Sequence, residues 1–192
     1  LELLSVFDML CLVILIVIQT LAAMKMAVLN KLLEQRAYTD THTGLPNKSA
    51  CEELLNNKET VGKHTACIMF DLNNLKIIND TKGHLMGDQL ILNFARLLRN
   101  VIPQKDFVGR YGGDEFMVVI YNTSKTEIED ILKQLSREKD RLNSSGNNMP
   151  IDYACGWAIS YADSECTIQM LLDKADYYMY ENKQAYKKSR KS

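Results

Sequence analysis

The seven residues Arg110-Tyr111-Gly112-Gly113-Asp114-Glu115-Phe116 place two adjacent carboxylates directly after a pair of glycines. Short apolar runs on either side are typical of a β-hairpin that presents its acidic side chains at the turn. Glycines in a turn tolerate positive φ and let another group approach the bare backbone. A triphosphate is such a group, and the carboxylates would then hold the magnesium that accompanies it. Taken alone, the stretch is equally compatible with an ordinary acidic turn.

The bulk composition is that of one ordinary domain with an extra element. The chain has 192 residues, of which 46% are hydrophobic, enough to fill a single core. Its net charge of −1 provides no basic field, so we expect no nucleic-acid partner. Five scattered cysteines without a Cys-x-x-Cys pair argue against a disulfide framework or a zinc site and favour a reducing cytosol. Because the chain starts at Leu1 rather than Met, we expect it to be a fragment of a longer protein.

Residues 9–24 form a run without charges near the N-terminus. A spanning helix needs about 17–25 apolar residues, a length that the run reaches if Lys25 snorkels and the next four residues are added. Acidic residues precede the run and basic residues follow it, so the positive-inside rule places the rest of the chain in the cytoplasm. We therefore expect residues 1–38 to be a transmembrane and linker helix that crosses the inner (cytoplasmic) membrane through residues 9–29. The alternative is a buried dimerisation helix in a soluble parent protein.

Residues 39–192 show the patterning of an α+β domain. Apolar runs of strand length predict two strands and a hairpin, at 64–70, 151–161 and 107–120 respectively. Amphipathic spacing and capping residues predict helices at 47–57, 75–83, 84–102, 124–142 and 167–187. This order indicates an antiparallel sheet with helices on its faces. Asp71 follows the first strand directly, which is a common position for metal and ligand chemistry.

Four motifs in this order resemble the GGDEF family of diguanylate cyclases. Residues 112–116, Gly-Gly-Asp-Glu-Phe, match the family's signature. A second motif, from Asp71 to Asp80 with Gly83-His84 and Gly87-Asp88, resembles the family's first strand and the turn that follows it. Thr43 to Asn47 resembles the start of the domain. Ala175-Asp176, with Tyr180 and Lys183, resembles the final helix. The resemblance covers about residues 38–188.

The resemblance implies both a fold and a reaction. The family has a palm-like (ferredoxin-like βααββαβ) nucleotidyl cyclase fold with a mainly antiparallel central sheet flanked by helices, here with a long N-terminal helix in addition. Each subunit binds one GTP substrate. Two subunits of a homodimer face each other, condense 2 GTP into cyclic di-GMP and release two pyrophosphates.

A metal site follows from this reaction, because phosphoryl transfer requires mainly positioning and charge neutralisation from a protein. Asp71 and the pair Asp114 and Glu115 are expected to converge from neighbouring strands on one or two Mg²⁺ (or Mn²⁺). The carbonyl of Leu72 is a candidate for a further ligand. The family assigns metal binding and the base role to Asp114 and Glu115 together, and the sequence leaves their division open.

Base choice is assigned to Asn79 and Asp88. Guanine presents N1–H and N2–H₂ as a donor pair that a carboxylate can accept, whereas adenine presents an acceptor at N1. Asp88 therefore favours GTP over ATP, and Asn79 can contact the purine edge. Outside the motif, Asp88 would equally fit an acidic residue that favours its own helix dipole.

Further substrate contacts are assigned to lysines and to the glycine pair. Lys183 matches the family's phosphate-binding lysine, and Lys187, four residues later on the same helix face, stands where arginine is usual. Without the resemblance, the two lysines would fit a solvated basic helix end. The remaining expected contacts are Lys76, Gly112 and Gly113.

The family's inhibitory site is incomplete here. It uses Arg-x-x-Asp ending five residues before the glycine pair, and this chain has Pro103-Gln104-Lys105-Asp106. Asp106 is present as a remnant, but proline cannot supply the bidentate contacts of the missing arginine. We expect product inhibition through this site to be weak or absent.

The main hypothesis is a membrane-tethered diguanylate cyclase that is switched by dimer geometry. One alternative is a catalytically silent module that binds GTP or cyclic di-GMP and signals by interaction, which the retained Asp71, Asp114 and Glu115 disfavour. A cyclase with a different base choice is disfavoured by Asp88.

Overall fold

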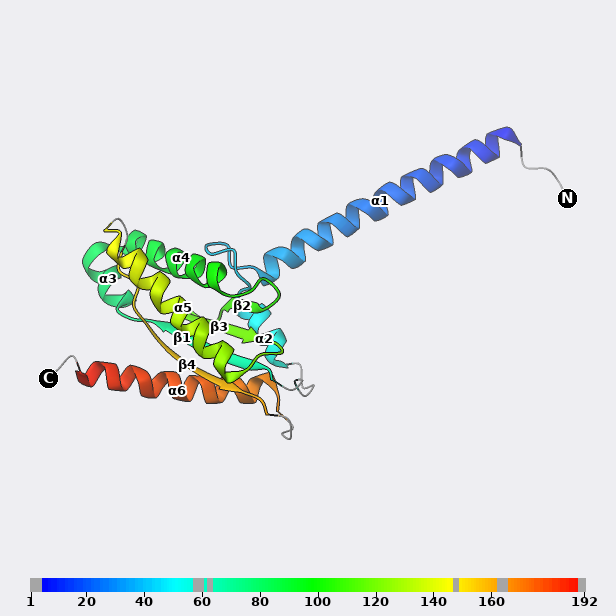
Figure 1. The fold of residues 1–192 in the computed structure, drawn as a ribbon. Coiled ribbons are helices and arrows are strands. Elements are labelled where there is room, and N and C mark those ends of the chain that lie inside the picture. The colour runs from blue at the N-terminus through cyan, green and yellow to red at the C-terminus, as the bar shows by residue number, and fades with distance from the viewer. Residues whose placement is uncertain (1–4, 57–60, 62–63, 147–148, 162–165, 190–192) are drawn as a thin grey trace. The chain divides into compact units, whose positions relative to one another are not determined.

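The computed structural model describes residues 5–56, 61, 64–146, 149–161 and 166–189 (Figure 1). The chain divides into two compact units, Leu1–Tyr38 and Thr39–Ser192. The helices are α1 (Val6–Tyr38), α2 (Lys48–Asn56), α3 (Leu75–Lys82), α4 (His84–Val101), α5 (Lys125–Ser144) and α6 (Ile168–Ser189). The strands are β1 (Ala66–Leu72), β2 (Phe107–Arg110), β3 (Glu115–Ile120) and β4 (Tyr153–Ile159).

The first unit contains the single long helix α1. Its 33 residues correspond to about 50 Å at 1.5 Å per residue. Ser5 and Asp8 cap its start, since the Ser5 N–H and hydroxyl donate to the Asp8 carboxylate and the Asp8 N–H donates to the Ser5 hydroxyl. By length and composition alone, α1 is able to cross a membrane, with a mean hydropathy of 2.5 over its most apolar window.

The second unit is built on a four-stranded antiparallel sheet in the order β2-β3-β1-β4. From β1 to β4, the elements follow the order βααββαβ. This arrangement confirms the predicted α+β fold class, including the antiparallel sheet and the long helix before it. Strand β1 is buried over its whole length because it lies inside the sheet and helices cover both faces.

Two apolar layers hold the helices on the sheet. On one face, β1 and β3 pack with α4 and α5 around the aromatic side chains of Phe70, Phe94 and Phe116, whose rings meet edge to face. On the other face, α2 and α6 cover residues such as Met69 and Met117. Figure 1 shows α4 and α5 on one side of the sheet and α6 on the opposite side.

Strand β4 and helix α6 are in unusually close contact. A Cβ atom at Gly156 would collide with the backbone of α6, at the Met179 nitrogen and the Ala175 carbonyl oxygen. Only glycine therefore lets α6 lie this close to the sheet. The distance between α6 and β4 sets the position of every side chain that α6 directs toward the end of β1.

Two strand boundaries differ from those predicted. Strand β1 continues through Asp71 to Leu72, so Asp71 lies within the strand rather than after it. Strand β4 spans 153–159 rather than 151–161. At the start of β4, the side-chain amide of Asn143 donates to the carbonyl of Ile151 and accepts from its N–H, at 2.8 Å each, so these backbone groups do not join the ladder.

Candidate active site

The sheet brings the predicted acidic residues together at one end of β1 and β3. Asp71 and Glu115 are directly paired across the antiparallel ladder. The next residue, Leu72, donates its N–H to the carbonyl oxygen of Asp114 at 2.9 Å. Asp71 and Glu115, which are 44 positions apart in the sequence, thus become neighbours because the two strands share this register.

Lys183 of α6 joins the same group. Its ammonium donates to Oδ1 of Asp71 at 2.6 Å, and the two side chains are 27% and 10% exposed. A short charge-assisted hydrogen bond with so little water around the carboxylate is stronger than a surface ion pair. The structure therefore brings Asp71, Asp114, Glu115 and Lys183 together.

The glycine turn is shaped by close approach rather than by positive φ. Neither Gly112 nor Gly113 is among the described residues with positive φ, so the turn does not use that conformational freedom of glycine. Instead, Tyr111 and Gly112 both donate their N–H groups to the Glu115 carbonyl, at 2.9 and 3.2 Å. A Cβ at Gly112 would lie 2.6 Å from Oε2 of Glu115. Glycine at this position lets the Glu115 carboxylate lie against the turn.

Arg110 fixes the other side of the turn and was missed by the sequence interpretation. Its guanidinium donates to the Gly113 carbonyl at 2.8 Å and to the Asp40 carboxylate at 3.1 and 3.3 Å. Asp40 also accepts from the N–H and hydroxyl of Thr43, at 2.8 and 2.6 Å. The spacing of Asp40 and Thr43, typical of a side-chain-capped turn, was the available signal.

These contacts control the pKa of Asp40. Burial acts to raise the pKa of the Asp40 carboxyl, but the hydrogen bonds from Thr43 and the charge of Arg110 outweigh it. The pKa of Asp40 in the folded chain therefore lies below its ordinary value. The carboxylate is stabilised in its ionised form.

The electrostatics of Glu115 reflect an excess of negative charge. Burial raises the pKa of the Glu115 carboxyl above its ordinary value. The charges of Asp114 and Asp71 raise it further, and that of Asp176 on α6 adds to them. Lys183 acts in the opposite direction. One lysine thus faces several carboxylates, which is an environment that attracts a further cation.

The oxygen-only donor set of Asp71, Asp114 and Glu115 fits a hard divalent ion. In the described part of the chain, no three Asp, Glu, His or Cys side chains form a ready-made metal cluster. Magnesium does not require one, because it usually keeps waters and takes phosphate oxygens beside one or two carboxylates. The donor set is therefore suited to a metal that arrives together with a phosphate ligand.

The residues predicted to read the base lie on the neighbouring helices α3 and α4. Asn79 is half-buried on α3, and Asp88 is exposed on α4. A Cβ at Gly87, the residue before Asp88, would occupy the space of the Asn79 side-chain oxygen. The Asn79 amide therefore rests on the backbone of α4 next to Asp88.

For three other predicted residues, the structure gives no contact with the acidic residues at the end of β1 and β3 among the residues that it describes. Lys76 is exposed on α3. The side chain of Lys187 lies outside the described residues. Asp106 is buried at the opposite end of β2 from the glycine turn, where its Oδ1 accepts from the Tyr121 N–H at 3.1 Å and its Oδ2 has no partner among the described residues.

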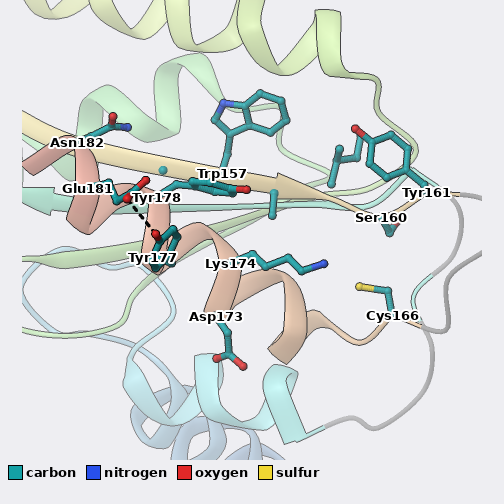
Figure 2. Close-up of a pocket in the computed structure, with 13 residues that line it drawn as sticks. Trp157, Ser160, Tyr161, Cys166, Asp173, Lys174, Tyr177, Tyr178, Glu181 and Asn182 are labelled. Atoms are coloured by element: carbon teal, nitrogen blue, oxygen red, sulfur yellow. Dashed lines mark hydrogen bonds between the residues drawn. The ribbon is translucent and has the colours of Figure 1, made fainter.

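Hollows in the surface do not all coincide with these residues. One hollow, of about 970 Å³, lies along β4 and α6 beside Trp157, Tyr177 and Tyr178 (Figure 2), and none of the predicted site residues lines it. A hollow of about 570 Å³ adjoins the glycine turn, and its lining residues include Lys48, Glu115 and the backbone of 110–113. Of the predicted acidic site residues, Glu115 lines this second hollow, and Asp71 and Asp114 are not among its lining residues.

The sequence matches the family described as "Diguanylate cyclase, GGDEF domain" over residues 37–189. The chain belongs to the GGDEF family. This confirms the resemblance found in the sequence motifs. The matched residues 37–189 overlap the second unit of the structure. Relatives of the chain include proteins named as a signaling protein, as diguanylate cyclases and as cyclic di-GMP phosphodiesterases.

Individual relatives agree with this assignment. The GGDEF chain is 32% identical over 164 residues to the signaling protein YkoW of Bacillus subtilis and 31% identical over 156 residues to the diguanylate cyclase DgcP of Pseudomonas aeruginosa. These matches cover 82% and 79% of this chain but only 20% and 23% of those proteins. Other relatives are named cyclic di-GMP phosphodiesterases.

A solved structure shares the fold. The coiled coil and GGDEF domain of DgcB from Caulobacter crescentus, crystallised in complex with c-di-GMP, has a TM-score of 0.77 and 22% identity. The match covers 91% of this chain and 95% of that one. At this identity the likeness concerns the fold alone.

Proposed function

We propose that this GGDEF domain condenses 2 GTP into cyclic di-GMP and releases two pyrophosphates, with a divalent metal and two facing subunits of a homodimer. The observation that carries the proposal is the pairing of Asp71 with Glu115 across β1 and β3, with Asp114 beside them and Lys183 on Asp71. This combines a cation-attracting group with a phosphate-attracting lysine. Phosphoryl transfer requires both.

Asp71, Asp114 and Glu115, with the carbonyl of Leu72, would hold Mg²⁺ (or Mn²⁺). A bound ion would neutralise phosphate charge and polarise the α-phosphorus for attack by the 3′-hydroxyl of the partner subunit's GTP. Asp114 or Glu115 would orient that hydroxyl or accept its proton.

Substrate positioning would be shared among three groups of residues. Asp88 would accept from guanine N1–H and N2–H₂, while Asn79, held against Gly87, would contact the purine edge. Lys183, Lys187 and Lys76 would contact phosphates. The bare backbone of Gly112 and Gly113 would let the triphosphate approach the turn.

Regulation by product through the family's inhibitory site would be weak. Pro103 stands at the arginine position of that site and is exposed, and Asp106 is the remaining half. The Asp106 carboxylate is partly engaged by the Tyr121 N–H. Proline has neither the charge nor the donors to hold a guanine or a phosphate.

For the first unit, we propose a membrane anchor and linker over residues 1–38, with the cyclase domain, residues 39–192, facing the cytoplasm from the inner membrane. Support comes from the apolar helix α1 and the basic residues that follow its charge-free part. The competing assignment is a dimerisation helix, for which the coiled coil of DgcB is a precedent.

The proposal is tested by incubating the dimeric chain with GTP and Mg²⁺ and identifying the products by mass spectrometry. We expect cyclic di-GMP and pyrophosphate, and loss of both with Asp114→Ala combined with Glu115→Ala. Lys133→Ala, at an exposed ion pair on α5, serves as the matched control and should retain product formation. A folded dimer that binds GTP and yields no cyclic dinucleotide would instead favour the silent binding module.

A further inference from the structure

The ammonium of Lys183 occupies the position of a cation on Asp71. Among the described residues, Lys183 is the one that forms an ion pair with the acidic residues at the end of β1 and β3, through Asp71. The Lys183 Nζ lies 2.6 Å from Oδ1 of a carboxylate that is only 10% exposed. A carboxylate in that environment requires a positive partner, and here the chain itself supplies it.

The same carboxylate is a candidate metal ligand. An ammonium in contact with Asp71 and a divalent ion bound to that side chain would repel each other strongly at such short range. The two cations therefore compete for Asp71. Lys183 has a flexible four-carbon stem and a side chain that is 27% exposed, so it is able to leave Asp71 without a change in the backbone.

We propose that Lys183 is a placeholder cation that suppresses metal binding until nucleotide arrives. While the site lacks nucleotide, Lys183 neutralises Asp71 and weakens metal binding there. A triphosphate offers Lys183 a new anionic partner, so the lysine leaves Asp71 as the metal–nucleotide pair enters. Metal and nucleotide then bind with positive coupling, since each favours the state in which Lys183 has moved. This inference rests on the proposed function, because it takes Asp71 to be a metal ligand and a nucleoside triphosphate to be the substrate.

The simpler alternative is a structural tie between α6 and β1. Such a tie would lower the stability of the chain when removed but would leave metal affinity unchanged. The two roles predict different results for metal alone, so the probe is Mn²⁺ without nucleotide, measured by electron paramagnetic resonance on the full chain. This readout does not depend on turnover.

We expect Lys183→Met to raise the affinity for Mn²⁺ about tenfold, the factor that corresponds to loss of one competing charged hydrogen bond. Lys183→Arg keeps the positive charge and should keep the affinity low. Lys174→Ala is the matched control, because Lys174 lies nine residues earlier on α6, on the opposite side of the helix, and is exposed. Unchanged or weaker Mn²⁺ binding by a folded Lys183→Met variant would overturn the proposal.

A second measurement uses the unsubstituted chain and so avoids any folding defect. Acetylation of Lys183, mapped by mass spectrometry, should increase severalfold when Mn²⁺ alone saturates the site and decrease when a non-hydrolysable GTP analogue is added. Constant acetylation of Lys183 at demonstrated Mn²⁺ occupancy would overturn the proposal. If the chain makes cyclic di-GMP and neither readout moves, the placeholder fails alone. If Mn²⁺ does not bind even with the analogue and no product forms, the proposed function fails, and the placeholder with it.

Discussion

At the scale of single residues, two glycines act by leaving space for a neighbouring functional side chain. At Gly112 the space is taken by the Glu115 carboxylate, and at Gly87 it is taken by the Asn79 side-chain oxygen. In both places a methyl group would push the neighbour from its position. The backbone itself is under no constraint there, since neither glycine has a positive φ.

Replacing Gly87 tests this role. We expect Gly87→Ala to raise KM for GTP about fivefold, because displacing Asn79 removes about one hydrogen bond to the base, on the order of 1 kcal/mol. The measurement is KM for GTP in the wild-type background and in an Asn79→Ala background. In the second background Gly87→Ala should have little further effect on KM, and an equal rise there would contradict the argument.

Residue types and spacing were enough to predict Asp71, Asp114 and Glu115 as site residues. Acidic residues at the ends of strands, next to a glycine pair in a turn, indicate phosphate and metal chemistry. The hydrogen bond between Lys183 and Asp71 was beyond reach, since it joins residues 112 positions apart. Local pattern does not encode such a contact. It depends on how closely α6 packs on the sheet.

At the scale of elements, Arg110 links the segment that follows α1 to the glycine turn. Its side chain contacts both Asp40 and the Gly113 carbonyl, and its N–H donates to the Pro46 carbonyl at 2.8 Å. Asp40 is the second residue after the end of α1 at Tyr38. The contacts within the second unit therefore tie the start of the domain to the turn between β2 and β3.

Removing the charge of Asp40 should destabilise the chain in a pH-dependent manner. We expect Asp40→Asn to lower the free energy of unfolding by about 1 kcal/mol at pH 7, because the hydrogen bonds from Thr43 and Arg110 favour the carboxylate. The pKa of Asp40 is lowered by folding from 3.8, so this contribution is present above that pH and is lost as the pH falls through the lower folded-state value. Urea unfolding at several pH values measures it.

The matched control for this experiment is Asp130→Asn. Asp130 pairs with Lys133 at 3.0 Å, but both side chains are more than 60% exposed, so its loss should change stability very little at any pH. An Asp40→Asn deficit that persisted undiminished at the lowest pH would show that packing, rather than the charge, is responsible.

Element types and order were predictable because β1 contains a continuous apolar run and because α4 and α5 are clearly amphipathic. The residues at which the helices and strands begin and end were less predictable. Strand β4 starts two residues later than expected because Asn143 satisfies the backbone of Ile151, a contact from a preceding helix. The connection between Arg110 and Asp40 was missed for a similar reason, since its two ends lie 70 residues apart.

At the scale of the whole molecule, the two units differ in how much of their apolar side-chain surface is exposed. Helix α1 exposes apolar side chains along its length, and those of Leu15, Ile16 and Val17 are each close to 50% exposed. The second unit instead buries apolar side chains in two layers. An apolar surface of this extent requires a lipid or protein environment.

Membrane fractionation distinguishes these environments. We expect chain 1–192 to remain in the membrane pellet after alkaline carbonate washing, because α1 has the length and hydropathy of a spanning helix. A chain limited to residues 39–192 should appear in the soluble fraction and serves as the control. Recovery of the full chain as a soluble dimer would favour the dimerisation helix instead.

The contact of Gly156 with the backbone of α6 has a consequence for how this domain can evolve. Gly156 is not among the predicted site residues. Its close contact with α6 nevertheless determines the distance between that helix and the sheet, and therefore the distance between Lys183 and Asp71. Any side chain at position 156 would lift the helix and lengthen that contact. Selection for catalysis would then act on a residue that never meets the substrate, and a scan of all substitutions would find position 156 as intolerant as the acidic turn.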